Sequence, residues 1–484
     1  MKKYITLGIL LLLLIVSCTN DFEETNTNPN QPEKVGSDLL LSKAIFTVAN
    51  RATQSGWDRG NTVAQLTAKI NFTGFDRYEW NSESALWDEY YGILPEIDII
   101  LRNSLKAETR NTTYEGIALI LRSYVFSILT DNWGNIPFSE AIKGLDGNFT
   151  PKYDSQQEIY TTILKDLKKA VAQLSLGQSI VISGTINGGD ILYQGDTDKW
   201  IKFANSLQLR YLLRISNKID VATAIKEIVD SGSYITTNAD NAMVPYPATA
   251  QTDSWPISTS RVGSFDEHRL SQTSETILKK FNDKRLFKWF QPTDNPDDDP
   301  NLYTGLTNGL SEDNASNFKG GAKNVSRVNK AYFYDSPNSV KAAMIQSAEV
   351  HFILAEAAQR GWIAADAKTL YETGIQHSFE HWEVDQDISA YTTQPGVAYD
   401  DTLETIITQK WLASFLVGFE AWYDFRRTGL PTIIVPGPDN VNSNQVPVRF
   451  LYPDSEQTLN SDNYKQTVSE IGGNTINIKG WWEN

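Results

Sequence analysis

A histidine and glutamate pattern late in the sequence has the spacing of a catalytic metal site. His377, Glu380 and His381 follow the H-x-x-E-H order of inverted zincins, in which two histidines on one helix face hold zinc. A working site also needs a third ligand from another helix and a pocket around the metal. We interpret this helix as part of the scaffold, and we expect no metal, no cofactor and no catalytic residue.

Two charged patterns allow binding as well as structural interpretations. Asp297 to Asp299 could coordinate calcium, but the run lacks the D-x-[DN]-x-[DN]-G spacing of a calcium loop. Arg426 and Arg427 could bind an anion, but cations at the end of a helix also complement its dipole, and we favour that structural role. A glycoside hydrolase would need two carboxylates flanking one bond, and no pair stands out among the many acids.

Aromatic residues beside polar residues in predicted loops form the candidate binding site. Sugar rings pack their C–H faces on aromatic rings, while their hydroxyls need amide, carboxylate or guanidinium partners. The candidate ligand-binding residues are Arg77, Tyr78, Trp80 and Asn81 in one loop, and Trp255, Arg261 and Tyr303 in a second region that could form the opposite wall. The alternative is that these rings seal the edge of a helix bundle.

The only cysteine, Cys18, follows a short apolar segment. Lys2 and Lys3 precede a largely apolar run from Ile5 to Val16, which is too short to span a membrane but suits a signal peptide. A small residue directly before the cysteine resembles a bacterial lipobox, in which the thiol is lipidated and becomes the new N-terminus. We therefore predict lipid anchoring at Cys18. The acidic residues that follow resemble an export signal to the cell surface, although they could also be a solvated tether.

Composition argues against nucleic-acid binding and is typical of an aromatic-rich globular protein. The formal net charge is −16, which argues against nucleic acid as a partner, because such binding draws on Lys and Arg to neutralise phosphates. Hydrophobic residues at 40% and charged residues at 21% are typical of a globular domain. The chain has 13 Trp, 21 Tyr and 20 Phe, an excess that suggests apolar platforms as well as core packing.

Apolar residues recur at three- and four-residue spacing along much of the chain, which predicts a mostly α protein. The predicted helices cover residues 38–52, 63–70, 84–101, 114–129, 155–174, 199–215, 222–229, 271–281, 342–361, 364–382 and 403–427. Pro95 should kink or split the third of these. The pattern suits helix-turn-helix pairs of the tetratricopeptide kind, although no consensus repeat recurs.

The predicted organisation is a single large domain behind a tether. Residues 1–17 read as the signal peptide, 18–34 as the lipid-anchored tether and 35–484 as the domain. Within the domain, residues from about 236 to 340 are irregular and rich in Pro, Gly, Asn, Ser and Asp. The tail, 432–484, is predicted to be rich in loops.

Several stretches together resemble the SusD/RagB family of Bacteroidetes outer-membrane lipoproteins, in particular its SusD-like branch. The stretches that carry the resemblance are the lipobox with Asn26–Asn30, Trp133–Ala141, Lys199–Ser216, the Asp283–Leu286 turn, Glu349–Gly361, Ile406–Pro431 and the Arg449–Trp482 tail. They occur in the order of the family and span nearly the whole chain.

The resemblance implies a helical scaffold of tetratricopeptide-like pairs and a non-enzymatic role at the cell surface. Members of the family capture nutrients for a TonB-dependent, SusC-like transporter in the outer membrane. The usual cargo is an oligosaccharide, and some relatives take peptides, which is the alternative here. The loop from Arg77 to Asn81 lies roughly where glycan-binding relatives place stacking aromatics.

Overall fold

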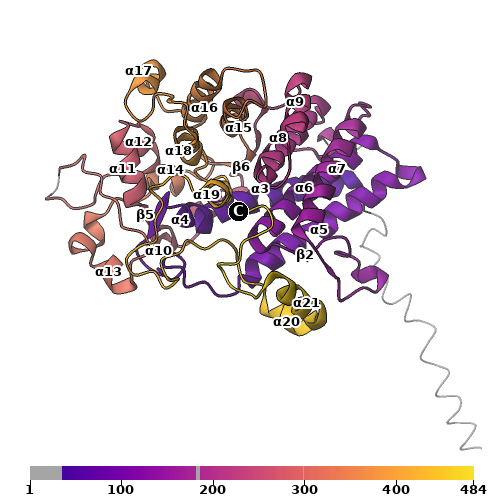
Figure 1. Cartoon of the computed structure of the whole chain (residues 1–484), viewed down its shortest axis with the longest axis horizontal. Helices are drawn as coiled ribbons and strands as arrows, with labels where there is room; N and C mark the ends of the chain where they lie inside the picture. Colours follow the sequence, from indigo (N-terminus) through magenta and orange to yellow (C-terminus); the bar gives the residue numbers. More distant parts are fainter. Residues whose placement is uncertain (1–34, 181–185, 298, 484) are drawn as a thin grey trace, which may run out of the picture.

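The computed structural model describes residues 35–180, 186–297 and 299–483, and it is mostly helical (Figure 1). The larger helices are α3 (Ser37–Ser55), α5 (Ser84–Leu105), α6 (Thr112–Trp133), α7 (Gln156–Leu174), α8 (Thr197–Ile215), α9 (Ala222–Ser231), α11 (Gln272–Lys280), α15 (Ser347–Gln359), α16 (Ala367–His381), α18 (Leu403–Ala413), α19 (Glu420–Thr428) and α21 (Ser461–Ile471). Shorter helices are α4 (Asn61–Val63), α10 (Val262–Phe265), α12 (Arg285–Trp289), α13 (Glu312–Ser316), α14 (Lys330–Phe333), α17 (Ile388–Thr393) and α20 (Asp454–Leu459).

Neighbouring helices pack as pairs that build the scaffold. The most extensive contacts join α5 to α6, α6 to α7, α7 to α8, and α15 to α16. Helix α7 shows why these segments form helices: the Ser155 and Glu158 side chains cap its first turn reciprocally, and its apolar residues face inward. Helix α6 lies among the others and is buried along nearly its whole length. The prediction of a mostly α fold is confirmed.

The described residues contain three small antiparallel sheets, each of two strands, and two of these sheets join the irregular region to segments outside it. The strand pairs are β1 (Thr67–Lys69) with β5 (His268–Leu270), β2 (Ile136–Pro137) with β3 (Tyr153–Asp154), and β4 (Ala242–Pro245) with β6 (Lys341–Ile345). The first pair has Thr67 opposite Leu270 and Lys69 opposite His268. It therefore joins segments about two hundred residues apart in the sequence.

Several predicted helix boundaries are wrong; for example, residues 342–345 of the helix expected over 342–361 belong to the strand β6 instead. The helix expected over 63–70 ends at Val63, because the chain turns at Gln65, whose φ is 56°, and then pairs as β1. The helix expected over 403–427 is interrupted between α18 and α19, where Leu416 and Gly418 take left-handed conformations. The tail contains the helices α20 and α21, which Figure 1 shows in yellow at the lower edge of the molecule.

Pro95 leaves its helix unbroken. It lies inside α5, which runs from Ser84 to Leu105 without an interruption, and its ring is exposed to solvent. The predicted split therefore does not occur.

Most buried charges in the core are paired with one another. Arg210 of α8 binds Glu349 of α15 with two hydrogen bonds of 2.7 and 2.6 Å. Arg427 of α19 binds Glu356 in the same bidentate way, at 2.6 and 2.7 Å. Arg426 donates to Glu483 from its Nε, at 3.0 Å. Arg426 and Arg427 therefore have a structural role as members of buried ion pairs, whereas the prediction based that role on the helix dipole.

The end of α6 holds the C-terminal tail to the scaffold. The Trp482 indole donates to the Asp131 carboxylate at 2.8 Å, and the Trp133 indole donates to the Leu451 carbonyl at 2.9 Å. The Phe450 amide donates to the Asn132 carbonyl at 2.8 Å. Three consecutive residues of one helix therefore each bind a tail residue more than 300 positions away.

Candidate functional site

A cleft of about 450 Å³ lies between two segments that are far apart in the sequence. One wall comes from residues 57 to 83, around the π-helical turn η1 (Gly56–Gly60) and the loop after β1. The opposite wall comes from residues 257 to 268, which include α10 and the first residue of β5. The β1–β5 pairing brings the two walls together.

The turn η1 places three consecutive residues, Trp57, Asp58 and Arg59, in the wall of the cleft. The turn can form because a glycine at position 60 lets it approach the backbone near Gly418: a Cβ at Gly60 would lie 2.0 Å from the Gly418 carbonyl oxygen. Single π-helical turns inside α-helices occur frequently at functional sites. The glycines thus allow a geometry that presents an aromatic and two charged side chains together.

Charged side chains line both sides of the cleft. Arg59 donates to the Glu83 carboxylate at 3.1 and 2.7 Å, and Lys69 lies 2.6 Å from a carboxylate oxygen of Glu267. Within the described residues, the Asp58 side chain makes no hydrogen bond and no ion pair. The Asp58 side chain is exposed to water, but many protein atoms surround its carboxyl group. This desolvation raises the pKa of Asp58 above its ordinary value, and the nearby charge of Arg59 opposes the rise. Asp58 therefore offers a carboxylate that is free to accept hydrogen bonds from a ligand.

The first wall also presents aromatic rings. Phe72 is 74% exposed and lines the cleft together with Phe75. The Phe75 ring stacks on Trp80, with ring centroids 4.7 Å apart and planes 8° from parallel. Glu312 of α13 accepts hydrogen bonds from the amides of Phe72 and Thr73, at 3.0 and 3.1 Å, and so fixes the loop. An exposed ring on a fixed loop is a suitable platform for a flat apolar face.

The second wall is supported from beneath by a buried aromatic cluster. Trp57 stacks on Phe265 at 5.6 Å and lies 4.9 Å from the His268 ring. Burial lowers the pKa of His268 well below its usual value, so the imidazole is neutral at physiological pH. The cleft thus combines a neutral aromatic floor with a charged rim.

All four predicted aromatic residues, including Tyr303, are buried, so the expectation that they form exposed platforms is wrong. Tyr78, Trp80 and Trp255 are 4%, 7% and 0% exposed. The Trp80 indole donates to the Phe75 carbonyl at 2.9 Å, and the Trp255 indole donates to the Phe333 carbonyl at 3.1 Å. Trp80 therefore supports the first wall from behind, and Trp255 packs edge-on against Trp57. These rings fit the alternative that they seal the bundle.

The other predicted residues lie near the cleft or away from it, but none of them lines it. Arg77 donates to the Asp439 carbonyl at 3.0 Å, which ties it to the tail. Asn81 and Arg261 are exposed and flank the two walls in the sequence. Tyr303 is 8% exposed and contacts Phe287. The walls of the cleft come instead from neighbours of the predicted residues in the sequence, such as Phe75 and Glu83 in the first wall and Ile257 and Ser260 in the second.

Sequence reasoning missed Trp57, Asp58, Arg59 and Phe72. Glycines on both sides of Trp57-Asp58-Arg59, at the end of a predicted helix, were a signal that the backbone changes there. Nothing in the sequence singled out Phe72, because the residue type alone does not show whether a phenylalanine in a loop is exposed or buried. In the structure its φ is 54°, a conformation that few residues other than glycine adopt.

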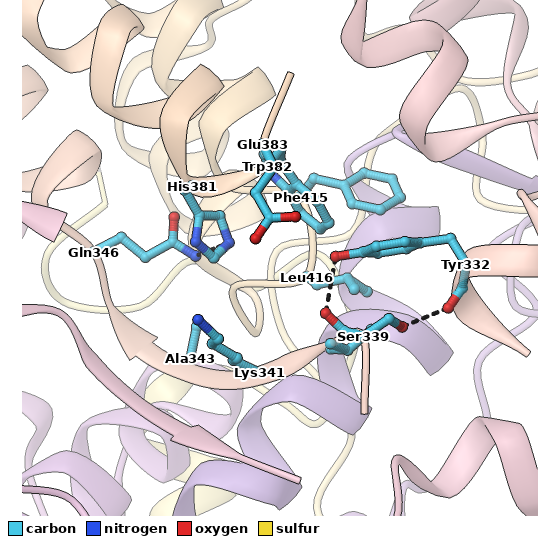
Figure 2. A pocket seen from close by; sticks show the side chains of 11 residues that line it. Tyr332, Ser339, Lys341, Ala343, Gln346, His381, Trp382, Glu383, Phe415 and Leu416 are labelled. Atoms are coloured by element: carbon cyan, nitrogen blue, oxygen red, sulfur yellow. Dashed lines mark hydrogen bonds between the residues drawn. The ribbon is translucent and has the colours of Figure 1, made fainter. Parts of the chain in front are cut away.

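The histidines of the H-x-x-E-H pattern have separate partners. His377 packs edge-on against His351, with ring centroids 4.8 Å apart. Figure 2 shows His381 facing Gln346 in the wall of a pocket of about 30 Å³, with 3.3 Å between the two side-chain nitrogens. Burial lowers the pKa of His381 to about 4. Among the described residues, no group of three or more His, Cys, Asp or Glu side chains is placed to hold a metal ion.

Two sequence predictions lie partly or wholly outside the described residues. Cys18, the signal peptide and the tether belong to residues 1–34, and position 298 of the Asp297–Asp299 run is also outside. In the part of the chain that is described, no helix has the length and apolarity needed to cross a bilayer.

The fold and the sequence place the chain in a known class of protein. The sequence model of the SusD-like_2 family, described as "Starch-binding associating with outer membrane", matches residues 29–453. The chain therefore belongs to the SusD-like family, and the resemblance noted in the sequence is confirmed. No protein with a curated description matches the sequence.

Several solved structures share the fold over almost the whole chain. A protein of Bacteroides vulgatus assigned to nutrient binding at the outer membrane is 26% identical, with a TM-score of 0.79, and the match covers 93% of this chain and 100% of that one. A SusD homologue of Bacteroides fragilis is 25% identical, with a TM-score of 0.78 and coverage of 93% and 99%. A chitin-binding protein is 26% identical, with a TM-score of 0.78 and coverage of 92% and 99%.

Proposed function

We propose that this protein binds oligosaccharide or polysaccharide at the cell surface, anchored by a lipid on Cys18, and delivers it to a TonB-dependent, SusC-like transporter. The observation that carries the proposal is the cleft in which the exposed Phe72 ring lies beside the free Asp58 carboxylate and the Arg59–Glu83 pair. A ring that stacks on a sugar face and polar groups that bind its hydroxyls are the two elements of glycan recognition.

Family membership supports a glycan as the ligand. The family description names starch, and one relative of 26% identity is a chitin-binding protein. Both are polymers of pyranose rings, which present alternating apolar faces and hydroxyl edges. Recognition by shape and hydrogen bonding involves no bond cleavage, so we expect the ligand to leave the cleft unchanged.

Binding to soluble starch and to chitin oligosaccharides, measured by isothermal titration calorimetry together with product analysis, tests this proposal. We expect saturable binding without cleavage. Phe72→Ala should weaken binding about tenfold, because the loss of one stacking ring corresponds to about 1.4 kcal/mol. Phe149, which is 78% exposed on another part of the surface, provides the matched control, and Phe149→Ala should leave the affinity unchanged.

Other outcomes would favour the alternatives. Release of shorter sugars would indicate a hydrolase, and absence of glycan binding together with binding of peptides would indicate peptide capture. Equal affinities of Phe72→Ala and Phe149→Ala for the glycan would place its site elsewhere. Delivery is tested separately, by co-purification of a SusC-like transporter with the tagged protein from outer membranes and by the loss of glycan uptake in a Cys18→Ala strain.

A further inference from the structure

A buried arginine in the C-terminal tail has no acidic partner among the described residues. Arg449 is 3% exposed, and its Nη2 is buried without a hydrogen-bond partner. Its Nε donates to the Phe450 carbonyl at 3.1 Å, and its guanidinium lies 4.5 Å from the centre of the Tyr452 ring. Neither contact neutralises the charge. A buried charge without a counter-charge is costly, since the protein interior solvates it poorly.

Most other buried arginines among the described residues show the usual solution, the exception being Arg269, which is 6% exposed and forms no ion pair there. Arg210, Arg214 and Arg285 are each 2% exposed or less, and each binds at least one carboxylate. Arg427 does so as well. Arg449 is buried in the same way but has no carboxylate partner, so a negatively charged group from outside the described residues would supply the missing ion pair.

Arg449 lines a pocket that is large enough for a small ligand. The pocket has a volume of about 230 Å³, and Arg426 and Lys479 also line it. None of its lining residues is acidic. Arg426 is paired with Glu483, whereas Arg449 has no such partner in the described residues, so the pocket retains an excess of positive charge. Trp481, which is half-buried, adds an indole ring to the wall.

We propose that this tail pocket binds a carboxylate-bearing small molecule, with the Arg449 guanidinium as the group that recognises the carboxylate. Guanidinium and carboxylate match in geometry and form paired hydrogen bonds. The indole of Trp481 would pack against the apolar part of the ligand. Two sources share this chemistry: a free organic acid, and the acid group of a sugar. The pocket is separate from the cleft that contains Phe72, because the two have no lining residue in common.

Calorimetric titration of the protein with sodium acetate, sodium glucuronate and neutral methyl glucoside, at constant ionic strength, tests the proposal. We expect glucuronate to bind saturably and methyl glucoside not to compete with it. Competition by acetate assigns the bare carboxylate as the ligand group, and binding of glucuronate alone assigns the sugar acid. Arg449→Gln should weaken the binding at least about tenfold, as expected for loss of a charge-assisted pair.

Two further variants keep the test decisive if Arg449→Gln does not fold. Trp481→Ala removes only a half-buried ring and should weaken glucuronate more than acetate. Lys465→Gln removes an exposed positive charge from α21 without touching the pocket and should bind like the wild type. Absence of saturable acid binding, or equal weakening by Lys465→Gln and Arg449→Gln, would overturn the proposal.

Discussion

Asp76 shows how one buried side chain holds the loop that carries the cleft aromatics. Its carboxylate accepts hydrogen bonds from the Lys69 amide at 3.1 Å and from the Asn308 side chain at 2.9 Å. It is 3% exposed, and burial raises its pKa to about 6, against the opposing effect of these hydrogen bonds. The Asp76 carboxylate therefore anchors the loop from β1 to Trp80, although burial makes the charged form of this side chain less stable than it would be in water.

The raised pKa of Asp76 predicts a specific dependence of stability on pH. Between the unfolded pKa of about 4 and the folded value of about 6, the folded state binds more protons, so the free energy of unfolding falls as pH rises. Relative to Asp76→Asn, which cannot titrate, the wild type should lose up to about 3 kcal/mol between pH 4 and pH 7. Urea unfolding at several pH values measures this difference. A difference that does not change with pH would contradict the assignment.

At the scale of elements, the turn η1 depends on close contact between two backbones. Gly60 allows the turn that holds Trp57 and Arg59 to lie against Gly418, which itself interrupts the predicted helix over 403–427. The π-helical turn and the break between α18 and α19 therefore lie in direct backbone contact.

Gly60→Ala tests this contact. The added Cβ would lie 2.0 Å from the Gly418 carbonyl oxygen, so we expect a loss of about 1–3 kcal/mol in unfolding free energy and weaker glycan binding. Gly92 provides the control, because it lies in α5 with no atom within 4 Å of an added Cβ. Gly92→Ala should stabilise the protein by about 0.5–1 kcal/mol. Equal effects of the two substitutions on stability would contradict the role assigned to the close approach.

The same elements show what sequence could predict and what it could not. The helix predicted over 155–174 matches α7 almost residue for residue, because an amphipathic pattern and its cap are local properties. The helix predicted over 63–70 was wrong because residues 67–69 form a strand, and the partner of that strand lies near residue 270. The candidate cleft lies next to the two predicted segments in the sequence, but Trp255 is buried where an exposed ring was predicted, and the exposed ring is Phe72, which was not predicted. The sequence shows that a side chain is aromatic, but the packing of the fold around it determines whether the ring is buried or exposed.

At the scale of the whole molecule, the tail is part of the scaffold. Trp482 is fully buried and donates to Asp131, which also binds Arg214 at 2.9 Å and accepts from Tyr160 at 2.6 Å. Residues from α6, α7, α8 and the tail thus share one carboxylate. Unfolding of the tail would expose this group together with the core around it, so the tail should not unfold independently.

Two substitutions of Trp482 separate its packing from its hydrogen bond. Trp482→Ala should cost about 3–5 kcal/mol of unfolding free energy, because a large ring leaves a cavity. Trp482→Phe keeps most of the ring and loses the bond to Asp131, which should cost about 1–3 kcal/mol. Denaturant unfolding monitored by circular dichroism measures both. A separate early transition in the wild type would show that the tail is an independent unit.

The pairing of β1 with β5 also bears on how this protein changes over evolution. The pairing uses main-chain groups, so it sets the separation of the cleft walls regardless of which side chains they carry. Lys69 and His268, which lie opposite each other in the pairing, both line the cleft. Substitutions at such positions alter the lining while the width is conserved. Under the proposed function, new ligand preferences can therefore arise through single substitutions without a new fold.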